Sequence, residues 1–423
     1  MSLSFLLRRG LCTTRRRCSA SKSISQNLPR VAEKSEDYPK TKRRRASKGT
    51  LPNEGPTALN TATYKKNQKK VTYVSENPLQ LPPHADWSAA FPPSGPTRNR
   101  VVLRNPATAD RVAQSFIPAD ARDKVIIEAF PGPGVLTRAL IKLPKTRIRK
   151  IIVLENQDMY FRYLKPLEEI DSRVQVLPLD GFSWDTYHAL DNQGYLKDVG
   201  VMPWDRSDPE LHFVAHLPSS VSGEQLTSQL LRLVPDRGWL FRYGRVPMSC
   251  VMHDSLWKRV SAESESSNRC KLSVIAEAVA SCHESLPAQT LSPYDDHFWP
   301  DATAALRNKS SPMVAVTMHP LAKQVIETGM LDKWDFCLRK LFVLKSNTLR
   351  RAIGHLAPGS ASLLTSLEDP SLSQDHADRI DVSKRVRDMN TLDWAAVVRA
   401  FDAWPFAPQD LFVTDSFSRD DRT

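Results

Sequence analysis

Short apolar runs of strand length, bounded by turn residues, recur through the middle of the chain. The first occupies residues 125–129 and is followed by Pro131-Gly132-Pro133-Gly134, after which residues 136–141 have helical spacing. Strand, glycine turn and helix in this order build the first βα unit of a doubly wound sheet. Glycines let a ligand approach the backbone, and the start of the helix offers free N–H groups. The turn therefore indicates a nucleotide-type ligand, the alternative being an ordinary tight turn after a buried strand.

Three further apolar runs resemble the first in having a polar residue at or near their ends. The four polar residues are Glu128 in the first run, Glu155 after residues 150–154, Asp180 after residues 174–179 and His216 after residues 211–215. The carboxyl ends of parallel strands meet at one edge of a sheet, so we expect these side chains to lie along that edge. In nucleoside-binding folds, an acid after the second strand takes the ribose hydroxyls, and one after the third can face the amine of adenine. The repetition predicts an adenosyl-type pocket, although strand ends also commonly carry polar caps.

The apolar pattern continues into a second region of different character. Helical spacing is present at residues 109–116, 223–234 and 253–260, and strand patterns are present at 246–252, 272–279 and 312–318. From about residue 325 the pattern becomes helical, with stretches at 334–344, 348–356 and 392–401. Lys and Arg are frequent on these stretches, which predicts a small helical domain with a basic face after an α/β domain.

Charge is distributed unevenly along the 423 residues. The formal net charge is +12, but residues 1–70 hold 18 Lys and Arg against 4 Asp and Glu, and the remainder holds 41 against 43. A nucleic-acid surface on the body must therefore be a local patch. Residues 1–30 are rich in Arg and Ser and contain no acid, which is typical of a mitochondrial transit peptide, with a disordered basic tail as the alternative.

Composition and pattern together divide the chain into five segments. Residues 31–98 are polar and rich in Pro, Lys and Arg, which predicts a disordered basic linker. We expect the α/β domain at 99–322, beginning near the helix-cap signal Asn105-Pro106, the helical domain at 323–406 and a flexible tail at 407–423. The six cysteines are scattered without metal-ligand spacing, so we expect neither a metal site nor a disulfide. No apolar run has the roughly 18 residues of a membrane helix.

Nine segments are informative when they are taken together, in their order and spacing. They are Leu103-Arg104-Asn105-Pro106, residues 128–137, Leu154-Glu155, Leu179-Asp180, residues 183–187, residues 239–246, residues 334–344, Gly354-His355 and Ala403-Trp404-Pro405-Phe406. With these segments the chain resembles the rRNA adenine N6-dimethyltransferase family and its mitochondrial transcription factor B branch, fungal members above all. The resemblance implies a class I S-adenosylmethionine-dependent methyltransferase fold, Rossmann-like with a mixed seven-stranded sheet, followed by a small all-α domain. It also implies an S-adenosylmethionine pocket, whose matching positions are Leu103, Glu128, Gly132, Gly134, Glu155 and Asp180.

The chain departs in two places, the turn and the end of the fourth strand, from the pattern of the enzymes that it resembles. Phe130 stands at the first glycine of the turn, where its ring could fill the space of the cofactor's methionine part. At the fourth strand the enzymes have Asn-Leu-Pro followed by an aromatic residue, whereas this chain has His216-Leu217-Pro218-Ser219. His216 and Pro218 are thus the catalytic positions of a degraded motif. Loss of base stacking, worth about 1–3 kcal/mol, together with misplacement of the target amine predicts that methyl transfer is lost or vestigial.

Two functions remain open at this stage. The resemblance and the degraded motif favour a transcription initiation factor that binds mitochondrial RNA polymerase and the melted non-template strand of promoter DNA, as a monomer in the mitochondrial matrix. The alternative is an active dimethyltransferase acting on small-subunit rRNA. Candidate nucleic-acid contacts, against the alternative of a solvated helix face, are Arg242, Tyr243, Arg245, Arg339, Lys340, Lys345, Arg350 and Arg351.

Overall fold

The computed structural model describes residues 80–302, 312–368 and 380–411, all of which belong to one compact unit. The predicted transit peptide, most of the predicted linker and the predicted tail from residue 412 lie outside the described residues. Within the described ranges no helix combines the length and apolar character needed to cross a bilayer. Those ranges also contain no cluster of metal-ligating side chains.

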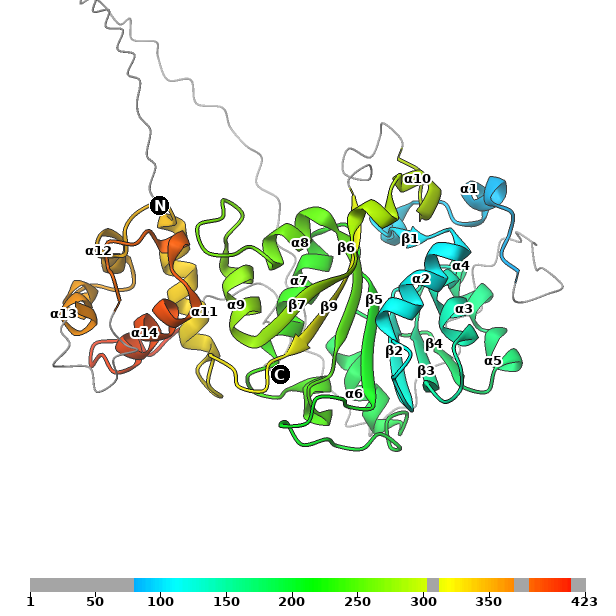
Figure 1. Cartoon of the computed structure of the whole chain (residues 1–423), viewed down its shortest axis with the longest axis horizontal. Helices are drawn as coiled ribbons and strands as arrows, with labels where there is room; N and C mark the ends of the chain where they lie inside the picture. The colour runs from blue at the N-terminus through cyan, green and yellow to red at the C-terminus, as the bar shows by residue number, and fades with distance from the viewer. Residues whose placement is uncertain (1–79, 303–311, 369–379, 412–423) are drawn as a thin grey trace, which may run out of the picture. The chain divides into compact units, whose positions relative to one another are not determined.

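A seven-stranded mixed sheet lies at the centre, with strand order β4-β3-β2-β5-β6-β9-β7 (Figure 1). Its strands are β2 (Lys124–Ala129), β3 (Ile148–Leu154), β4 (Val174–Leu177), β5 (Leu211–His216), β6 (Met248–His253), β7 (Ala280–Leu286) and β9 (Met313–Pro320). All neighbouring pairs from β4 to β6 are parallel, whereas β9 pairs antiparallel with both β6 and β7. This arrangement confirms the class I methyltransferase fold that the sequence resemblance implied.

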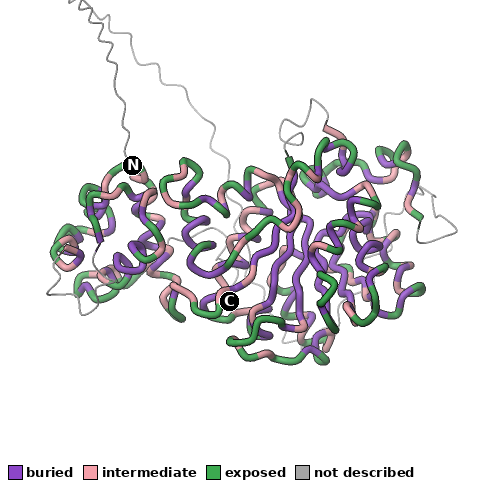
Figure 2. The backbone as a smooth tube through the Cα atoms, in the orientation of Figure 1, coloured by how far each residue is buried: buried purple, intermediate pink, exposed green. Residues whose placement is uncertain are grey.

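Helices cover both faces of the sheet because its central strands are apolar on both sides. In β2, Ile126 belongs to one hydrophobic cluster, while Val125 and Ile127 belong to the other. Figure 2 shows these central strands as nearly continuous purple, the colour of buried residues. One face is covered by α2 (Pro106–Phe116), α3 (Val135–Lys142), α4 (Asp158–Leu164) and α5 (Leu167–Ile170). The other is covered by α6 (Trp184–Asn192), α7 (Val221–Arg232), α8 (Asp254–Val260) and α9 (Lys271–Val279).

The predicted strand at residues 272–279 is wrong, because this stretch forms α9 and the strand β7 begins only at Ala280. Seven of the nine residues of α9 are buried, so the helix has apolar side chains nearly all round. A short apolar run of this kind has no periodicity that separates a strand from a buried helix. The helix begins with a capping box between Cys270 and Ser273.

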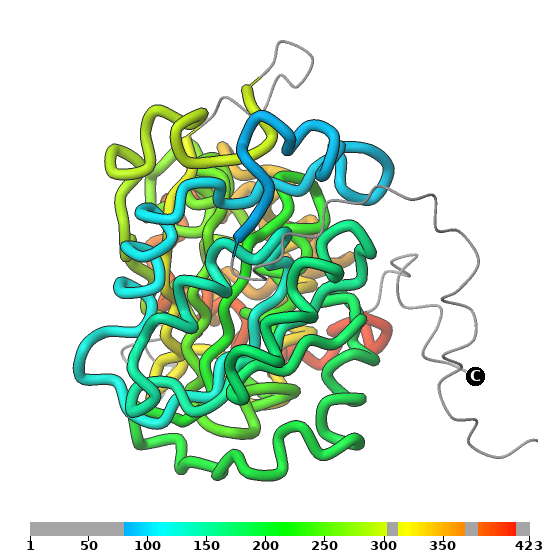
Figure 3. The backbone as a smooth tube through the Cα atoms, turned by 90° about the vertical axis from the view of Figure 1, so that its right-hand side faces the viewer, coloured from blue at the N-terminus to red at the C-terminus, as the bar shows by residue number. Residues whose placement is uncertain are grey.

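Ordered structure begins earlier than the sequence indicated. Residues 80–100, of which 80–98 were placed in the predicted linker, form a strap that includes α1 (Trp87–Ala90) and buries Trp87 and Phe91 against the α2–α5 face. The strap leads into β1 (Val102–Leu103), which pairs with β8 (Phe298–Trp299) beside α10 (Tyr294–His297). Figures 1 and 3 both place the blue strap at the same end of the sheet as α10. Asn105 then caps α2 as predicted, accepting hydrogen bonds from two backbone N–H groups.

The last part of the chain is helical, as predicted. It contains α11 (Leu331–Leu341), α12 (Leu349–Ala352), α13 (Leu363–Glu368) and α14 (Thr391–Asp402). Stacked pairs Phe336–Phe401 and Phe342–Trp394 join α11 and the turn after it to α14. The hydrophobic cluster of the α6–α9 face continues into these helices, so no break in packing marks residue 322. The division of the body at residues 322 and 323 stays a prediction.

Candidate functional site

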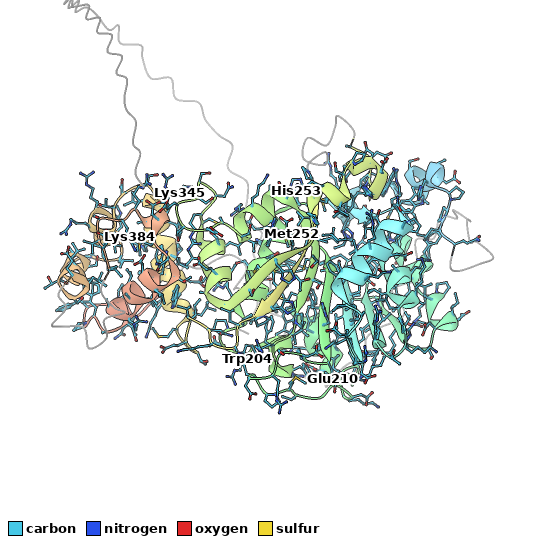
Figure 4. The ribbon with its side chains drawn as sticks, viewed as in Figure 1. Trp204, Glu210, Met252, His253, Lys345 and Lys384 are labelled. Atoms are coloured by element: carbon cyan, nitrogen blue, oxygen red, sulfur yellow. The ribbon has the colours of Figure 1, made fainter. Side chains whose placement is uncertain are left out.

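The polar residues predicted to share an edge of the sheet are brought together there. Glu128 pairs in register with Val153 and Val214, so Glu155 and His216 follow two residues later on the two neighbouring strands. Asp180 follows β4, the next strand outward. We call this the carboxyl edge. In Figure 4 it lies at the same end as Met252 and His253, whereas Glu210, just before β5, lies at the opposite end.

The turn between β2 and α3 is tightly packed. Gly132 and Gly134 both have positive φ, and a Cβ on either would overlap a neighbouring side chain, that of Val102 or Leu164. Phe130 retains the left-handed conformation expected of the glycine that it replaces, with φ 58°. This conformation is costly for a bulky residue. The turn therefore keeps a left-handed backbone at Phe130, where the resemblance implies a glycine.

Glu155, the acid expected to take a ribose, is bound by Arg100 from the strap. Two guanidinium nitrogens of Arg100 donate to the two carboxylate oxygens at 2.5 and 3.2 Å, and both side chains are buried. The guanidinium also lies over the rings of Phe130 and Tyr160, at 5.2 and 5.3 Å from the centroids. Although burial alone would lower it, the Glu155 carboxylate raises the pKa of the Arg100 guanidinium above its usual value.

Glu128 lies deep in the same edge without a strong partner. Burial, with the Glu155 carboxylate nearby, raises its pKa to about 8 against the pull of the Thr137 hydroxyl and of Arg138. Neither oxygen meets a donor in hydrogen-bond geometry among the described residues. Glu128 is therefore protonated at neutral pH and does not present a carboxylate to a ligand.

His216 and its neighbours form the degraded motif at the end of β5. Burial and the charge of Arg100 lower the pKa of His216 to about 3, so its ring is neutral. Neither ring nitrogen has a hydrogen-bond partner within the described part of the chain. The Ser219 N–H donates to the carbonyl of Asn99 at 2.9 Å, which ties the motif to the strap. A neutral imidazole and a serine thus stand where the resemblance implies a carboxamide and a stacking ring.

An open hollow of about 470 Å³ lies beside this motif. Its walls come from the loop after β5, the start of α7 and the start of α8: Leu217, Pro218, Ser219, Ser220, Val221, Glu224, His253, Ser255, Leu256 and Arg259. Val221 is 70% exposed at its rim, and Arg259 forms an ion pair with Glu224. The hollow offers apolar, hydroxyl and cationic groups together on an accessible surface.

The remaining predicted cofactor positions have structural contacts of their own. Leu103 is buried in β1, paired with Phe298. Asp180 accepts a hydrogen bond from the Phe182 N–H, and its carbonyl accepts one from the Thr186 hydroxyl. Gly132 donates its N–H to Glu155. The turn and the strand ends thus hold one another together without an added ligand.

The predicted nucleic-acid residues fall into two groups. Arg242 and Tyr243, in a 3-10 turn at residues 239–243, both bind Asp191, and Arg245 donates to the carbonyls of Arg206 and Pro320. The second group lies on the helical domain: Arg339 donates to the carbonyl of Leu411, Lys345 to that of Ser267, and Arg350 pairs with Glu368. Lys340 and Arg351 are exposed. These nucleic-acid roles stay predictions.

An S-adenosylmethionine site is implied at the carboxyl edge by the fold, but the residues present do not fit one. The ribose acid is already bound by Arg100, and the Phe130 side chain occupies the turn. Sequence reasoning missed Arg100 and Tyr160, which complete this arrangement. Arg100 and Glu155 lie 55 positions apart, and nothing in the sequence pattern pairs them.

Several known proteins are similar to this chain. Residues 101–384 match the family described as ribosomal RNA adenine dimethylase. The chain is 25% identical over 296 residues to "Mitochondrial transcription factor 1" of Saccharomyces paradoxus, covering 68% of this chain and 82% of that protein. It is 30% identical over 153 residues to "Dimethyladenosine transferase 1, mitochondrial" of Xenopus tropicalis, covering 36% of this chain and 41% of that protein. A solved dimethyladenosine transferase from Plasmodium falciparum is 17% identical with a TM-score of 0.48, covering 71% of this chain and 97% of that one.

Proposed function

This chain belongs to the ribosomal RNA adenine dimethylase family, and we propose that it acts in mitochondria as a transcription initiation factor rather than as a methyltransferase. Relatives named mitochondrial transcription factor 1 align with 68% of the chain, and relatives named mitochondrial dimethyladenosine transferase support the same organelle. The protein would act as a monomer in the matrix, bind mitochondrial RNA polymerase and help it to recognise and open promoter DNA.

The observation that carries the proposal is the motif at the end of β5. A methyltransferase must hold the adenine amine in line with the methyl group, and small misplacements cost on the order of 100-fold in rate. Here the motif has a neutral, buried imidazole at His216, and Ser219 stands where an aromatic residue would stack on a flipped base. The scaffold of the family is kept while its reacting centre is lost.

The proposal that the protein binds melted DNA is supported by an open hollow and by exposed cationic side chains. The hollow beside Pro218 is open at the surface, and Lys340 and Arg351 lie on the surface of the helical domain. Lys and Arg side chains on a surface attract phosphates, and release of counterions supplies most of the affinity for a single strand. We propose that the non-template strand follows these exposed groups.

Run-off transcription with purified mitochondrial RNA polymerase tests the proposal. On a double-stranded promoter template, correctly initiated product should require this protein. On a template pre-melted around the start site, the requirement should be relieved, because opening is then already done. Equally specific initiation on the closed template without the protein would contradict the proposal.

The alternative function, S-adenosylmethionine-dependent dimethylation of mitochondrial small-subunit rRNA, is supported by family membership and by the acids kept at Glu128, Glu155 and Asp180. Incubation with radiolabelled S-adenosylmethionine and unmodified small-subunit rRNA measures it directly. We expect no incorporation of label above a control without protein. Incorporation at adenines of the rRNA would favour the alternative.

Residues 1–30 lie outside the described structure, and we propose that they direct import into the matrix. A fusion of these residues to a reporter protein, incubated with energised isolated mitochondria, should become protected from external protease and be shortened. A reporter that stays accessible would contradict the role of this segment while leaving the transcription proposal untouched.

A further inference from the structure

The carboxylate of Glu155 is fully engaged by the chain itself. Its Oε2 accepts from Arg100 at 2.5 Å and from the Gly132 N–H at 3.3 Å. Its Oε1 accepts from Arg100 at 3.2 Å and from the Gln157 N–H at 3.1 Å. An ionised carboxylate offers about four lone-pair sites, and all of them are used. No acceptor position remains for the two hydroxyls of a ribose.

The Arg100 guanidinium is held in place from several sides. It lies over the rings of Phe130 and Tyr160, and only 7% of its side chain is exposed. The Phe130 ring in turn packs over Gly181, where an added Cβ would lie 3.4 Å from two ring carbons. An aromatic ring and a cation thus fill adjoining parts of the turn, and each stabilises the position of the other.

The backbone on either side of Arg100 closes the same region. The Asn99 carbonyl accepts from the Ser219 N–H at 2.9 Å, and the Arg100 N–H donates to Thr97 at 2.9 Å. Val102 lies so close to Gly132 that no side chain fits between them. Neighbouring residues at the C-terminal end of the strap are therefore fixed to two parts of the sheet, Arg100 to Glu155 just after β3 and Asn99 to the loop after β5.

We propose that Arg100 is an internal ligand that has replaced the nucleoside at Glu155, and that it excludes S-adenosylmethionine while fastening the strap to the sheet. A ribose could reach Glu155 only by displacing a buried guanidinium. That displacement would leave the Arg100 charge unpaired in the interior, which is strongly unfavourable. Arg100, with Phe130 beside it, thus determines that the family's cofactor site takes no nucleoside in this chain. The inference concerns the cofactor site alone and holds whether or not the protein acts in transcription.

Titration calorimetry on the full chain, with S-adenosylmethionine and S-adenosylhomocysteine as probes, tests the proposal. The wild-type protein should give no saturable heat at millimolar probe. The double variant Arg100→Ala/Phe130→Gly frees both Glu155 oxygens and restores the glycine of the turn, so it should bind at least tenfold more tightly than the wild type. The variant Arg98→Ala is the matched control, because it removes an exposed arginine two residues away and should behave as wild type.

Folding is checked separately, because the double variant leaves Glu155 buried without its cation. Urea unfolding should show a lower midpoint for Arg100→Ala than for Arg98→Ala, and the pair Arg100→Ala/Glu155→Gln should recover most of the loss. Recovery by the pair shows that the ion pair fastens the strap even if the calorimetric variant does not fold. Equal midpoints for Arg98→Ala and Arg100→Ala would overturn the proposal.

Two further outcomes would overturn it. One is saturable binding of S-adenosylmethionine by the wild type with the affinity of the double variant. The other is a double variant that folds but binds neither probe, because the exclusion would then have another cause. If the wild type binds the cofactor and still directs promoter-specific run-off, this inference fails and the proposed function stands. If the wild type binds no cofactor and does not direct promoter-specific run-off, the proposed function fails and this inference stands.

Discussion

The two halves of the carboxyl edge differ sharply. The half at the ends of β2 and β3 is closed, with Glu155 saturated by donors and Phe130 filling the turn. The half at the end of β5 is open, with a hollow of about 470 Å³ lined by the loop after β5 and the starts of α7 and α8. A methyltransferase needs both halves open to each other, since the methyl donor lies in one and the target base in the other. Here the closed half holds the strap and the turn together, while the open half remains accessible.

Under the proposed function, the difference explains how methyl transfer can be lost while the scaffold is kept. The closed half replaces an external ligand by an internal ion pair, so the glycine turn and the strand ends keep their positions. The open half keeps an accessible hollow, in which Ser219 stands where the resemblance implies a stacking ring. A binding protein built on an enzyme needs the second half only.

The largest expected difference in stability comes from replacing one glutamate by alanine in each half of the carboxyl edge. Glu155→Ala leaves the Arg100 charge buried and unpaired, so it should lower the free energy of unfolding by about 3–5 kcal/mol. Glu224→Ala breaks an ion pair with Arg259 in which both side chains are well exposed, so it should cost about 0–1 kcal/mol. Urea unfolding followed by circular dichroism measures both. Similar losses in the two variants would show that the closed half is not specially packed.

A second comparison replaces a glycine by alanine in the closed half and in the helical domain. A Cβ at Gly181 would lie 2.7 Å from the Ala129 Cβ and 3.4 Å from the Phe130 ring, so Gly181→Ala should destabilise by about 1–3 kcal/mol through overpacking. Gly354, in the helical domain, has open space around the corresponding position. Gly354→Ala should therefore be neutral or slightly stabilising. A tolerated alanine at residue 181 would mean that the Phe130 ring can move away.

How much of the fold and of the carboxyl edge the sequence could predict depends on how far apart in the sequence the interacting residues lie. The acids after successive strands were predictable, because parallel topology brings strand ends together whatever the loops do. The helix α9 was not, since its buried residues surround the axis and leave no period to detect. The Arg100–Glu155 pair was also beyond reach, because it depends on the path of a strap whose only apolar anchors are isolated residues such as Trp87 and Phe91.

The exposed cations of the helical domain lead to a prediction about DNA binding. Lys340→Ala/Arg351→Ala removes two exposed cations of the helical domain, so the log–log salt slope of binding to single-stranded DNA should fall by about 2. Lys142→Ala/Lys145→Ala removes the same charge from α3 and the loop after it, and should leave the slope unchanged. Fluorescence anisotropy at several salt concentrations measures both. Identical slopes for the two double variants would place the DNA elsewhere.

The last expected effect is a pH dependence inside the closed half. The pKa of Glu128 is raised from 4.5 to about 8 by burial, so between these values the folded state holds a proton that the unfolded chain has lost. Stability must therefore fall as pH rises through this window, by at most about 1.4 kcal/mol per pH unit. His212 and His216, whose pKa values burial lowers to about 3, act in the opposite direction and only below about pH 6.5.

Unfolding measured between pH 6.5 and 8.5 thus isolates Glu128 from these histidines. Glu128→Gln keeps the shape but cannot titrate, so its stability should decline less steeply with pH than that of the wild type, and its relative stability should be greatest near pH 8. Gly354→Ala changes no titratable group and should keep the wild-type slope. If Glu128→Gln also keeps that slope, the carboxyl is already ionised in the folded protein. The closed half would then have to contain a donor or water that neutralises its burial, and it would be less completely sealed than the Arg100 contacts imply.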